Sequence, residues 1–296
     1  MAYDVAIRGR DDQWTLDDRL AELEARLRDL GSVVVAFSGG ADSAFLLAAA
    51  VRALGTDHVV AATAVSSSLP TAELNPAADF CASLGVRHLT PQTHEMERAG
   101  YRANAGDRCY FCKAELIDVL APIADDLGFA AVATGTNADD AVAGFRPGIR
   151  AAAERGAETP LLDAGLTKAQ IRAASRAWRL PTWDKPAAAC LSSRIAFGVE
   201  VTPTRLARVE RAEVALREWL EAHGIAVTDL RVRDLGTTAR VEVDTAALSA
   251  LTAAGHAPAA VVALVKDVGF SDVLVDPRGF RSGSMNELLA DPDVYR

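Results

Sequence analysis

Short apolar runs alternate with longer helical patterns along the first two thirds of the chain. Four runs of small or β-branched residues predict buried strands, at residues 33–37, 58–65, 86–89 and 130–134. The segments around them predict helices, at residues 16–30, 44–54, 71–84, 110–127 and 167–178. This alternation indicates an α/β fold with a doubly wound parallel sheet. Because ligands bind beyond the carboxyl ends of such strands, Ser38, Ser66 and Gly135 should line one crevice.

The pattern changes near residue 197. A long helix at 203–223 precedes two strands at 228–233 and 239–243, which we expect to form a hairpin. A helix at 258–268 and a strand at 272–275 follow, which is typical of a small α+β unit. A chain of 296 residues is long for one ordinary domain. We therefore predict two domains, residues 1–195 and residues 196–296.

Composition narrows the class of protein. Half of the residues are hydrophobic, which is ample for a core, and the net charge of −9 disfavours a large nucleic-acid surface. The first residues do not have the pattern of a signal peptide, and no apolar run approaches the roughly 20 residues that span a bilayer. Four cysteines without a secretory signal indicate free thiols or ligands. We expect a cytoplasmic protein with no membrane or nucleic-acid partner.

The first strand runs directly into a glycine-rich loop. The loop reads Ser38-Gly39-Gly40-Ala41-Asp42-Ser43. The glycines allow backbone N–H groups to approach a polyanion, and the helix that follows favours phosphate at its N-terminus. No lysine follows the glycines as in a kinase-type phosphate loop, and the dinucleotide pattern GxGxxG is absent. A plain serine-capped turn is the alternative, but the strand before the loop and the helix after it favour an ATP site.

The cysteines form two groups downstream of this loop. Cys109 and Cys112 make a CxxC pair, and Cys190 lies about 80 residues further along. A CxxC pair is typical of a redox centre, half a zinc site or part of an iron–sulfur site. Three thiolates can hold a [4Fe–4S] cluster with one iron open to sulfide, which we favour over a disulfide relay. Cys81 lies in a predicted helix and is interpreted as a buried structural thiol.

The loop resembles that of the PP-loop ATP pyrophosphatases, which split ATP into AMP and pyrophosphate. Longer segments resemble the LarE family, chiefly Tyr101-Arg-Ala-Asn-Ala-Gly-Asp-Arg-Cys-Tyr-Phe-Cys-Lys113 and Leu180-Pro-Thr-Trp-Asp-Lys-Pro186 through Arg194. Shorter matches are at residues 93–97, 135–140, 146–148, 160–161, 165–168 and 279–284. Residues 141–144 depart from the family, since they are apolar where a polar stretch is expected.

The resemblance implies an ATP-dependent sulfurtransferase that makes the nickel-pincer nucleotide of lactate racemase. ATP and Mg²⁺ would adenylylate a pyridinium carboxylate mononucleotide, and sulfur would then displace AMP to leave a thiocarboxylate. One version of the family sacrifices a single cysteine, here Cys190, which becomes dehydroalanine. The other carries sulfide on a [4Fe–4S] cluster held by three cysteines, and Cys109, Cys112 and Cys190 match it. The family also implies a homo-oligomer such as a hexamer, whereas the sulfide source is not indicated.

These inferences assign a set of site residues. The ATP site comprises Ser38, Gly39, Gly40, Asp42, Ser43 and Gly135. The Mg²⁺ candidates are Asp42 and Asp140, with Asp139 and Glu242 as further metal-binding or orienting carboxylates. By resemblance, Ser193, Arg194, Arg231 and Arg233 would bind the substrate phosphate. Arg231 and Arg233 alternate on one strand, so both guanidiniums would share a face. The alternative is that both are surface arginines on an edge strand.

Three other functions remain open at this stage. A PP-loop tRNA thiolase also uses three cysteines, but the acidic charge counts against tRNA binding. An amide-forming synthetase would use ammonia and would not need the three cysteines. A non-enzymatic nucleotide-binding regulator would release no pyrophosphate.

Overall fold

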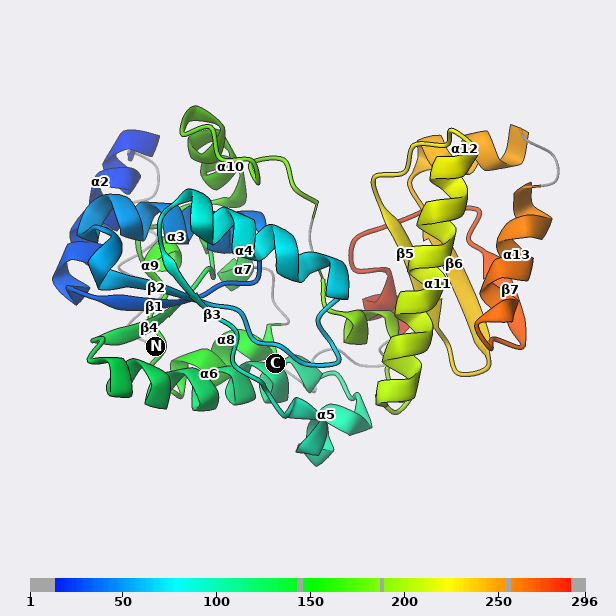
Figure 1. Ribbon diagram of the computed structural model, residues 1–296, viewed down its shortest axis with the longest axis horizontal. Helices are drawn as coiled ribbons and strands as arrows, with labels where there is room; N and C mark the ends of the chain where they lie inside the picture. Colours follow the sequence, from blue (N-terminus) through cyan, green and yellow to red (C-terminus); the bar gives the residue numbers. More distant parts are fainter. Residues whose placement is uncertain (1–13, 143–145, 187–188, 254–256, 289–296) are drawn as a thin grey trace.

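The computed structural model describes residues 14–142, 146–186, 189–253 and 257–288. The described residues form two sheets, each packed against its own helices (Figure 1). None of the helices in these ranges is long and apolar enough to cross a membrane.

The first sheet has four parallel strands. They are β1 (Val33–Ala36), β2 (Val59–Ala62), β3 (Arg87–Leu89) and β4 (Ala131–Thr134). The order is β3-β2-β1-β4, with Val33 opposite Val59 on one side and Ala131 on the other. The predicted parallel sheet is thus confirmed, and the strand order reverses direction between β1 and β4. Such a reversal is where α/β sheets bind ligands.

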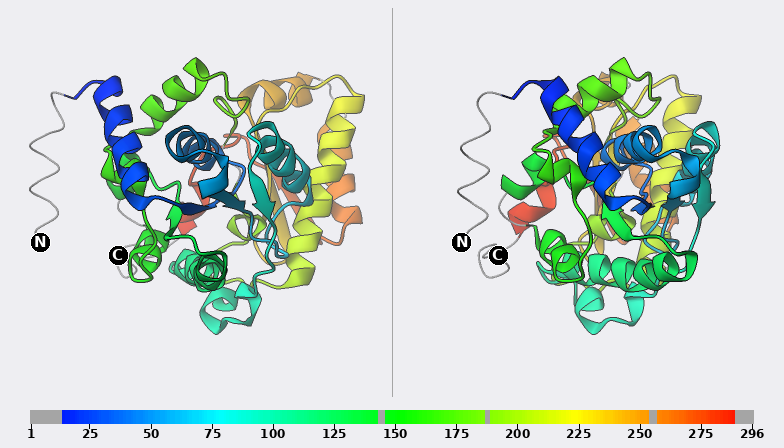
Figure 2. Two further views of the ribbon diagram at one scale, coloured as in Figure 1. Left: turned by 60° about the vertical axis from the view of Figure 1, so that its left-hand side comes forward. Right: turned by 90° about the vertical axis from the view of Figure 1, so that its left-hand side faces the viewer.

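Both faces of this sheet are covered, which makes it doubly wound (Figures 1 and 2). Alternate residues of β1 point to opposite faces, so Val33 and Val35 enter one core and Val34 and Ala36 enter another. The first core contains side chains from α2 (Leu16–Leu30), α3 (Ala41–Leu54), α4 (Leu74–Ser83), α9 (Pro160–Asp163) and α10 (Lys168–Ala177). The other contains side chains of α6 (Arg108–Leu127), which packs against α8 (Pro147–Ala153).

Most predicted elements are present with shifted ends. Thr167 is the N-cap of α10 and forms a capping box with Gln170. Helix α3 starts three residues earlier than predicted, and the predicted helix at 71–84 is divided into a 3₁₀ turn, η2 (Thr71–Glu73), and α4. Short elements that lacked a hydrophobic period were not predicted. They are α5 (Ala99–Ala103), α7 (Ala138–Val142), α8, α9, α12 (Thr245–Ala253) and the 3₁₀ turns η1 (Thr56–His58), η3 (Glu95–Glu97), η4 (Leu191–Arg194) and η5 (Ser284–Leu288).

The second sheet has three strands and confirms the predicted α+β unit. They are β5 (Leu230–Asp234), β6 (Thr238–Val243) and β7 (Asp272–Val275). β5 and β6 pair antiparallel, as expected for a hairpin, whereas β7 joins β6 in parallel. Helices α11 (Pro203–Ala222), α12 and α13 (Ala257–Asp267) all contribute buried side chains to the core of this unit.

Residues from the first unit help to build the second. Tyr101 and Leu191 belong to the same buried cluster as the strands of the second sheet. Asn104 is completely buried in a left-handed conformation (φ 52°), and its Nδ2 donates to the carbonyl oxygens of Ile195, Ala196 and Val199 at 2.7–3.3 Å. The segment before α6 is therefore tied to the segment after Cys190. The domain boundary at residues 195 and 196 stays a prediction.

Candidate active site

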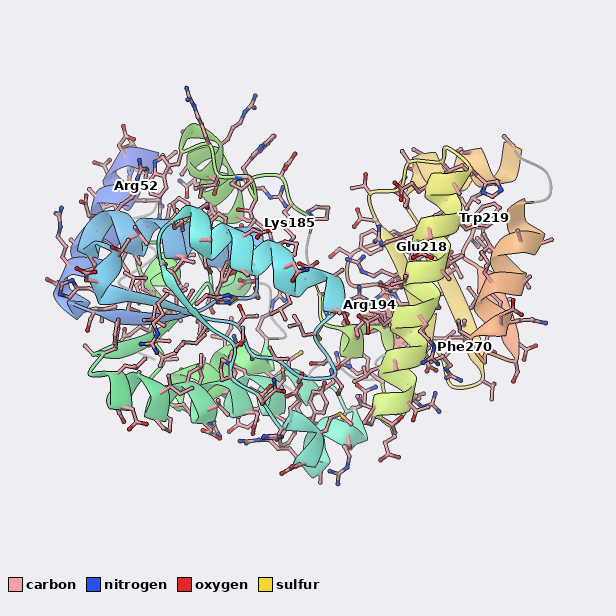
Figure 3. The ribbon with its side chains drawn as sticks, viewed as in Figure 1. Arg52, Lys185, Arg194, Glu218, Trp219 and Phe270 are labelled. Carbon is pink, nitrogen blue, oxygen red and sulfur yellow. The ribbon has the colours of Figure 1, made fainter. Side chains whose placement is uncertain are left out.

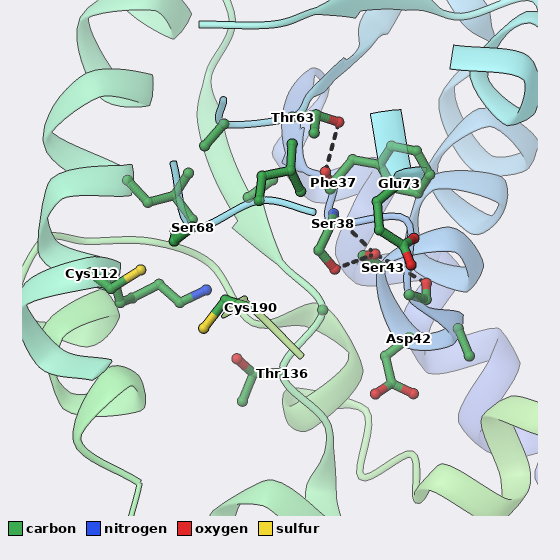
Figure 4. A pocket seen from close by; sticks show the side chains of 18 of the residues that line it. Phe37, Ser38, Asp42, Ser43, Thr63, Ser68, Glu73, Cys112, Thr136 and Cys190 are labelled. Atoms are coloured by element: carbon green, nitrogen blue, oxygen red, sulfur yellow. Dashed lines mark hydrogen bonds between the residues drawn. The ribbon is translucent and has the colours of Figure 1, made fainter. Parts of the chain in front are cut away.

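A cavity of about 440 Å³ lies beyond the carboxyl ends of β1, β2 and β4. Ser38, Ser66 and Gly135 all line it, so the expectation that they share one crevice is confirmed. Figure 4 shows the side chains around it, with the loop after β1 on one side and the sulfur atoms of Cys112 and Cys190 on another. The loop follows β1 at the reversal in strand order, where a ligand is expected.

The loop after β1 is held closed by Ser43. The Ser43 Oγ accepts the backbone N–H of Ser38 at 3.3 Å, lies 3.2 Å from the Ser38 Oγ and donates to the Gly40 carbonyl at 3.1 Å. Gly39 adopts φ +71°, which glycine reaches without strain. Among the described residues no side chain caps the N-terminus of α3 at Gly40, so its first N–H groups are available to a polyanion.

Gly135 allows the end of β4 to approach α3 closely. A Cβ at this position would lie 2.9 Å from the Ser43 nitrogen and 3.0 Å from its Cα, and both atoms are backbone. Gly135 thus sets the distance between β4 and the loop, in addition to lining the cavity.

Asp42 has a buried carboxylate oxygen that lacks a hydrogen-bond partner among the described residues. Its Oδ2 lies 3.2 Å from the Asn137 Nδ2 and 3.6 Å from the Lys168 Nζ, whereas its buried Oδ1 has no hydrogen-bond partner among the described residues. Burial raises the pKa of Asp42, the Lys168 charge opposes this and the Asp140 charge adds to it. Asp140 lines the same cavity. Two carboxylates with one unpartnered oxygen form a donor set that fits Mg²⁺.

Asp139 has a different place from its neighbour Asp140. Its carboxylate accepts the backbone N–H of Lys168 at 2.8 Å at the start of α10, and it is absent from the cavity lining. Of the two predicted alternatives, only Asp140 is therefore placed to meet a ligand in the cavity.

Cations around the cavity were not assigned from the sequence. They are Lys113, Lys168, Arg172 and Lys185. The Lys185 Nζ donates to the Gly39 carbonyl at 3.0 Å and to Glu73 at 2.6 Å, so it ties the segment before Cys190 to the loop. Lys185 lies in the segment between the two sheets (Figure 3). All but Arg172 lie within segments that resemble the LarE family, but resemblance alone gave them no role.

The three cysteines are brought into one region, but with unequal exposure. Cys112 and Cys190 line the cavity, whereas Cys109 is exposed and lies outside the lining. Burial raises the pKa of the Cys112 thiol, and the neighbouring Cys190, Glu95 and Cys109 raise it further. Among the described residues, no group of three or more Cys, His, Asp or Glu side chains is arranged to hold a metal ion. Cys81 is buried in the first core as predicted, and burial raises its pKa to about 11.

Three of the four predicted phosphate-binding residues meet in a smaller cavity. Ser193, Arg231 and Arg233 line a space of about 150 Å³ together with residues 282–284. Arg194 is not part of that lining, and it forms a buried ion pair with Glu213 at 3.0 Å.

The arginines of β5 are not surface residues. Arg231 is 7% exposed and Arg233 is 5% exposed, so the alternative of two surface arginines is wrong although β5 is an edge strand. Burial lowers the pKa of Arg231 to about 10, and the nearby Arg194 charge contributes. Arg233 pairs with Glu242 at 2.9 Å, so Glu242 orients an arginine.

Known proteins with similar sequences cover nearly the whole chain. Residues 17–109 match the family described as NAD synthase. An uncharacterized protein of Synechocystis is 38% identical over 93% of this chain and 99% of its own length. The pyridinium-3,5-bisthiocarboxylic acid mononucleotide synthase of Lactiplantibacillus plantarum is 33% identical over 93% of this chain and 96% of its own length. An uncharacterized protein of Methanocaldococcus jannaschii is 27% identical over 60% of this chain.

The parallel sheet, the Ser-Gly-Gly loop at its reversal point and the match to NAD synthase define a PP-loop protein. Identity to the Lactiplantibacillus enzyme over almost the full length of both chains is more specific. The chain belongs to the LarE family.

Replacing Gly135 should destabilise the fold through the loop that it touches. Gly135→Ala places a Cβ against the Ser43 backbone and should lower the free energy of unfolding by about 1–3 kcal/mol. Gly40→Ala is the control, because the added Cβ would meet only the Ser38 Oγ at 3.5 Å. That change should cost about 0.5 kcal/mol. Urea unfolding of the two variants checks this, and equal midpoints would contradict the close contact.

Proposed function

We propose that this chain is an ATP-dependent sulfurtransferase that converts a pyridinium carboxylate mononucleotide into its thiocarboxylate. The observation that carries this proposal is that the loop at the N-terminus of α3 and two cysteine thiols line the same cavity. Family membership supplies the substrate class, because the relative from Lactiplantibacillus is named for a pyridinium bisthiocarboxylic acid mononucleotide.

In the first half-reaction the cavity activates a carboxylate. The ATP phosphates lie against Ser38 to Ser43 and the free N–H groups of α3. A substrate carboxylate oxygen attacks the α-phosphorus, the bond from that phosphorus to the bridging oxygen breaks, and pyrophosphate leaves. Asp42 and Asp140 would hold Mg²⁺, which when bound neutralises phosphate charge. Lys168 and Arg172 line the same cavity and offset the remaining negative charge.

In the second half-reaction sulfur replaces AMP. A sulfur nucleophile attacks the acyl carbon, the carbon–oxygen bond to AMP breaks, and AMP leaves with the electron pair. Adenylylation is needed because a free carboxylate is a poor electrophile. Cys112 and Cys190 line the cavity in which the adenylate forms, so sulfur and electrophile meet without a second binding event.

We further propose that Cys109, Cys112 and Cys190 hold a [4Fe–4S] cluster. Burial lowers the pKa of Arg108 and the charges of Cys109 and Cys190 raise it, so both thiols lie near this guanidinium, and Cys112 follows Cys109 by one turn of α6. Three thiols can supply the ligands of such a cluster with one iron left open to sulfide. In the described structure they are not arranged around a metal ion. When bound, the cluster would supply renewable sulfide, so that no sulfur is taken from the protein. In the alternative, Cys190 loses its own sulfur by cleavage of the Cβ–S bond and loss of the Cα proton, which leaves dehydroalanine.

The smaller cavity is proposed to bind the substrate phosphate. Ser193, Arg231 and Arg233 line it, and Ser193 lies three residues after Cys190. Arg194 is proposed to position this segment, since its guanidinium is paired with Glu213 and donates to the Cys190 carbonyl at 3.0 Å. We also propose that the chain forms a homo-oligomer, for which the family implies a hexamer. Its location is proposed to be the cytoplasm, where its thiols would stay free.

The reaction is tested by following its products. The chain should convert ATP, sulfide and pyridinium-3,5-biscarboxylic acid mononucleotide into AMP, pyrophosphate and a product in which sulfur replaces oxygen. Mass spectrometry should find this product with the wild type and with Cys81→Ala, the control thiol outside the cavity, but not with Cys190→Ala. Thiolation of tRNA in place of the nucleotide, or an amide product with ammonia, would overturn the assignment.

The sulfur source is tested by metal analysis. After anaerobic purification and reconstitution, the wild type and Cys81→Ala should each contain about four iron and four sulfide per chain, and Cys109→Ala should lose most of both. After turnover, mass spectrometry of the peptide that contains Cys190 should show an intact cysteine with no loss of its sulfur. Absence of iron together with dehydroalanine at Cys190 would contradict the cluster and support the sacrificial route.

A further inference from the structure

Glu95 is a buried carboxylate in the wall of the main cavity. It is the first residue of the 3₁₀ turn η3 and is only 3% exposed. It lines the cavity together with Cys112 and Cys190. It lies within residues 93–97, which resemble the LarE family, but the resemblance gave it no role.

The hydrogen bonds of Glu95 are all on one oxygen. Its Oε1 accepts the hydroxyl of Ser66 at 2.5 Å and that of Ser68 at 2.7 Å. Within the described ranges, no ion pair or hydrogen bond reaches Oε2. The nearest arginine in sequence, Arg98, is committed to Glu115 at 2.8 Å and to Asp118 at 2.6 Å. A carboxylate that is almost fully buried therefore has no cationic partner in the described protein.

The backbone around Glu95 is fixed, so its carboxylate is held beside the cavity. Glu115 on α6 accepts the backbone N–H of His94 at 2.9 Å, which ties η3 to the helix that carries Cys112. On the other side, the Ser68 carbonyl accepts the N–H of Leu191, next to Cys190, at 2.8 Å. The carboxylate thus lies between the two chain segments that carry the cavity thiols.

A buried charge without a partner is costly, and a ligand of opposite charge removes that cost. Two lysines of the cavity are already matched within the protein: Lys185 pairs with Glu73, and Lys168 contacts Asp42. Lys113 also lines the cavity, but no ion pair joins it to Glu95 among the described residues. An N-substituted pyridinium ring carries a permanent positive charge. It cannot lose this charge to a base, and its ring nitrogen has no N–H to donate. Only an anion or an aromatic face can recognise it.

We propose that Glu95 is the counterion of the pyridinium ring and makes the enzyme select the cationic ring over a neutral one. This inference rests on the proposed function. The pairing places the ring beside Cys112 and Cys190, so that its carboxylate meets the sulfur donor. A neutral dihydropyridine ring with the same carboxylates and phosphate would leave Glu95 buried and unpaired, and is disfavoured.

The test combines a side-chain change with a change in ring charge. Calorimetry on the full-length chain, without ATP, compares pyridinium-3,5-biscarboxylic acid mononucleotide with its 1,4-dihydropyridine form, whose ring is neutral. The wild type should bind the cationic ring about tenfold more tightly, and Glu95→Gln should lose this preference by weakening only the cationic ligand. Glu95→Asp keeps the charge and should keep most of the preference.

Glu97→Gln is the matched control, because Glu97 lies in the same turn with an 81% exposed side chain. It should leave both affinities unchanged. If Glu95 only positions the Ser66–Ser68 loop, Glu95→Gln will weaken both ligands equally, and that result overturns the inference, as does equal binding of both ligands by the wild type. A wild type that binds neither nucleotide overturns the proposed function itself.

Discussion

The segment that carries Cys190 is held in place by two side chains at the start of α6, Asn104 just before the helix and Arg108 at its first residue. The Asn104 amide donates to three carbonyl groups of that segment, and the Arg108 guanidinium donates to the Ser192 carbonyl at 2.9 Å. Both side chains are buried, so each lost partner would leave a polar group unsatisfied at a cost of about 1–3 kcal/mol. These bonds bring Cys190 to the cavity opposite the loop after β1. Lys185, which donates to the Gly39 carbonyl, and Leu191, which donates to the Ser68 carbonyl, hold the same segment from the other side.

The charge distribution of the cavity follows from the same arrangement. The chain is acidic overall, yet four cations line the cavity. Lys185 and Lys168 contact the loop, where the phosphates of ATP are proposed to lie, whereas Lys113 neighbours Cys112 on α6. Asp42 lies among these cations, and its buried Oδ1 has no hydrogen-bond partner among the described residues. An oxygen of this kind is available to bind a metal ion. Glu95 gives the thiol side of the cavity the opposite charge. The loop side of the cavity is therefore suited to polyphosphate, and Glu95 is proposed to bind a cation on the thiol side.

The sequence predicted what depends on local patterns and missed what depends on distant contacts. The β-branched runs predicted the parallel strands, because a strand covered on both faces is apolar throughout. The loop after Phe37 was recognisable since its glycines and serines are adjacent. Glu95, Lys113 and Lys185 were not assigned, because their places in the cavity lining arise from contacts between distant segments, such as that of Lys185 with Gly39, 146 residues earlier. Arg194 was assigned to phosphate, but its partner Glu213 lies on a helix that only the fold brings beside it.

Activation by ATP and sulfur delivery are proposed to be separate steps in one cavity. Exchange of labelled pyrophosphate into ATP, measured with the pyridinium biscarboxylate nucleotide and without sulfide, reports adenylylation alone. We predict nucleotide-dependent exchange in both the wild type and Cys190→Ala, because the loop at α3 does not require the thiol. No exchange in either protein, or exchange that does not depend on the nucleotide, would contradict the account.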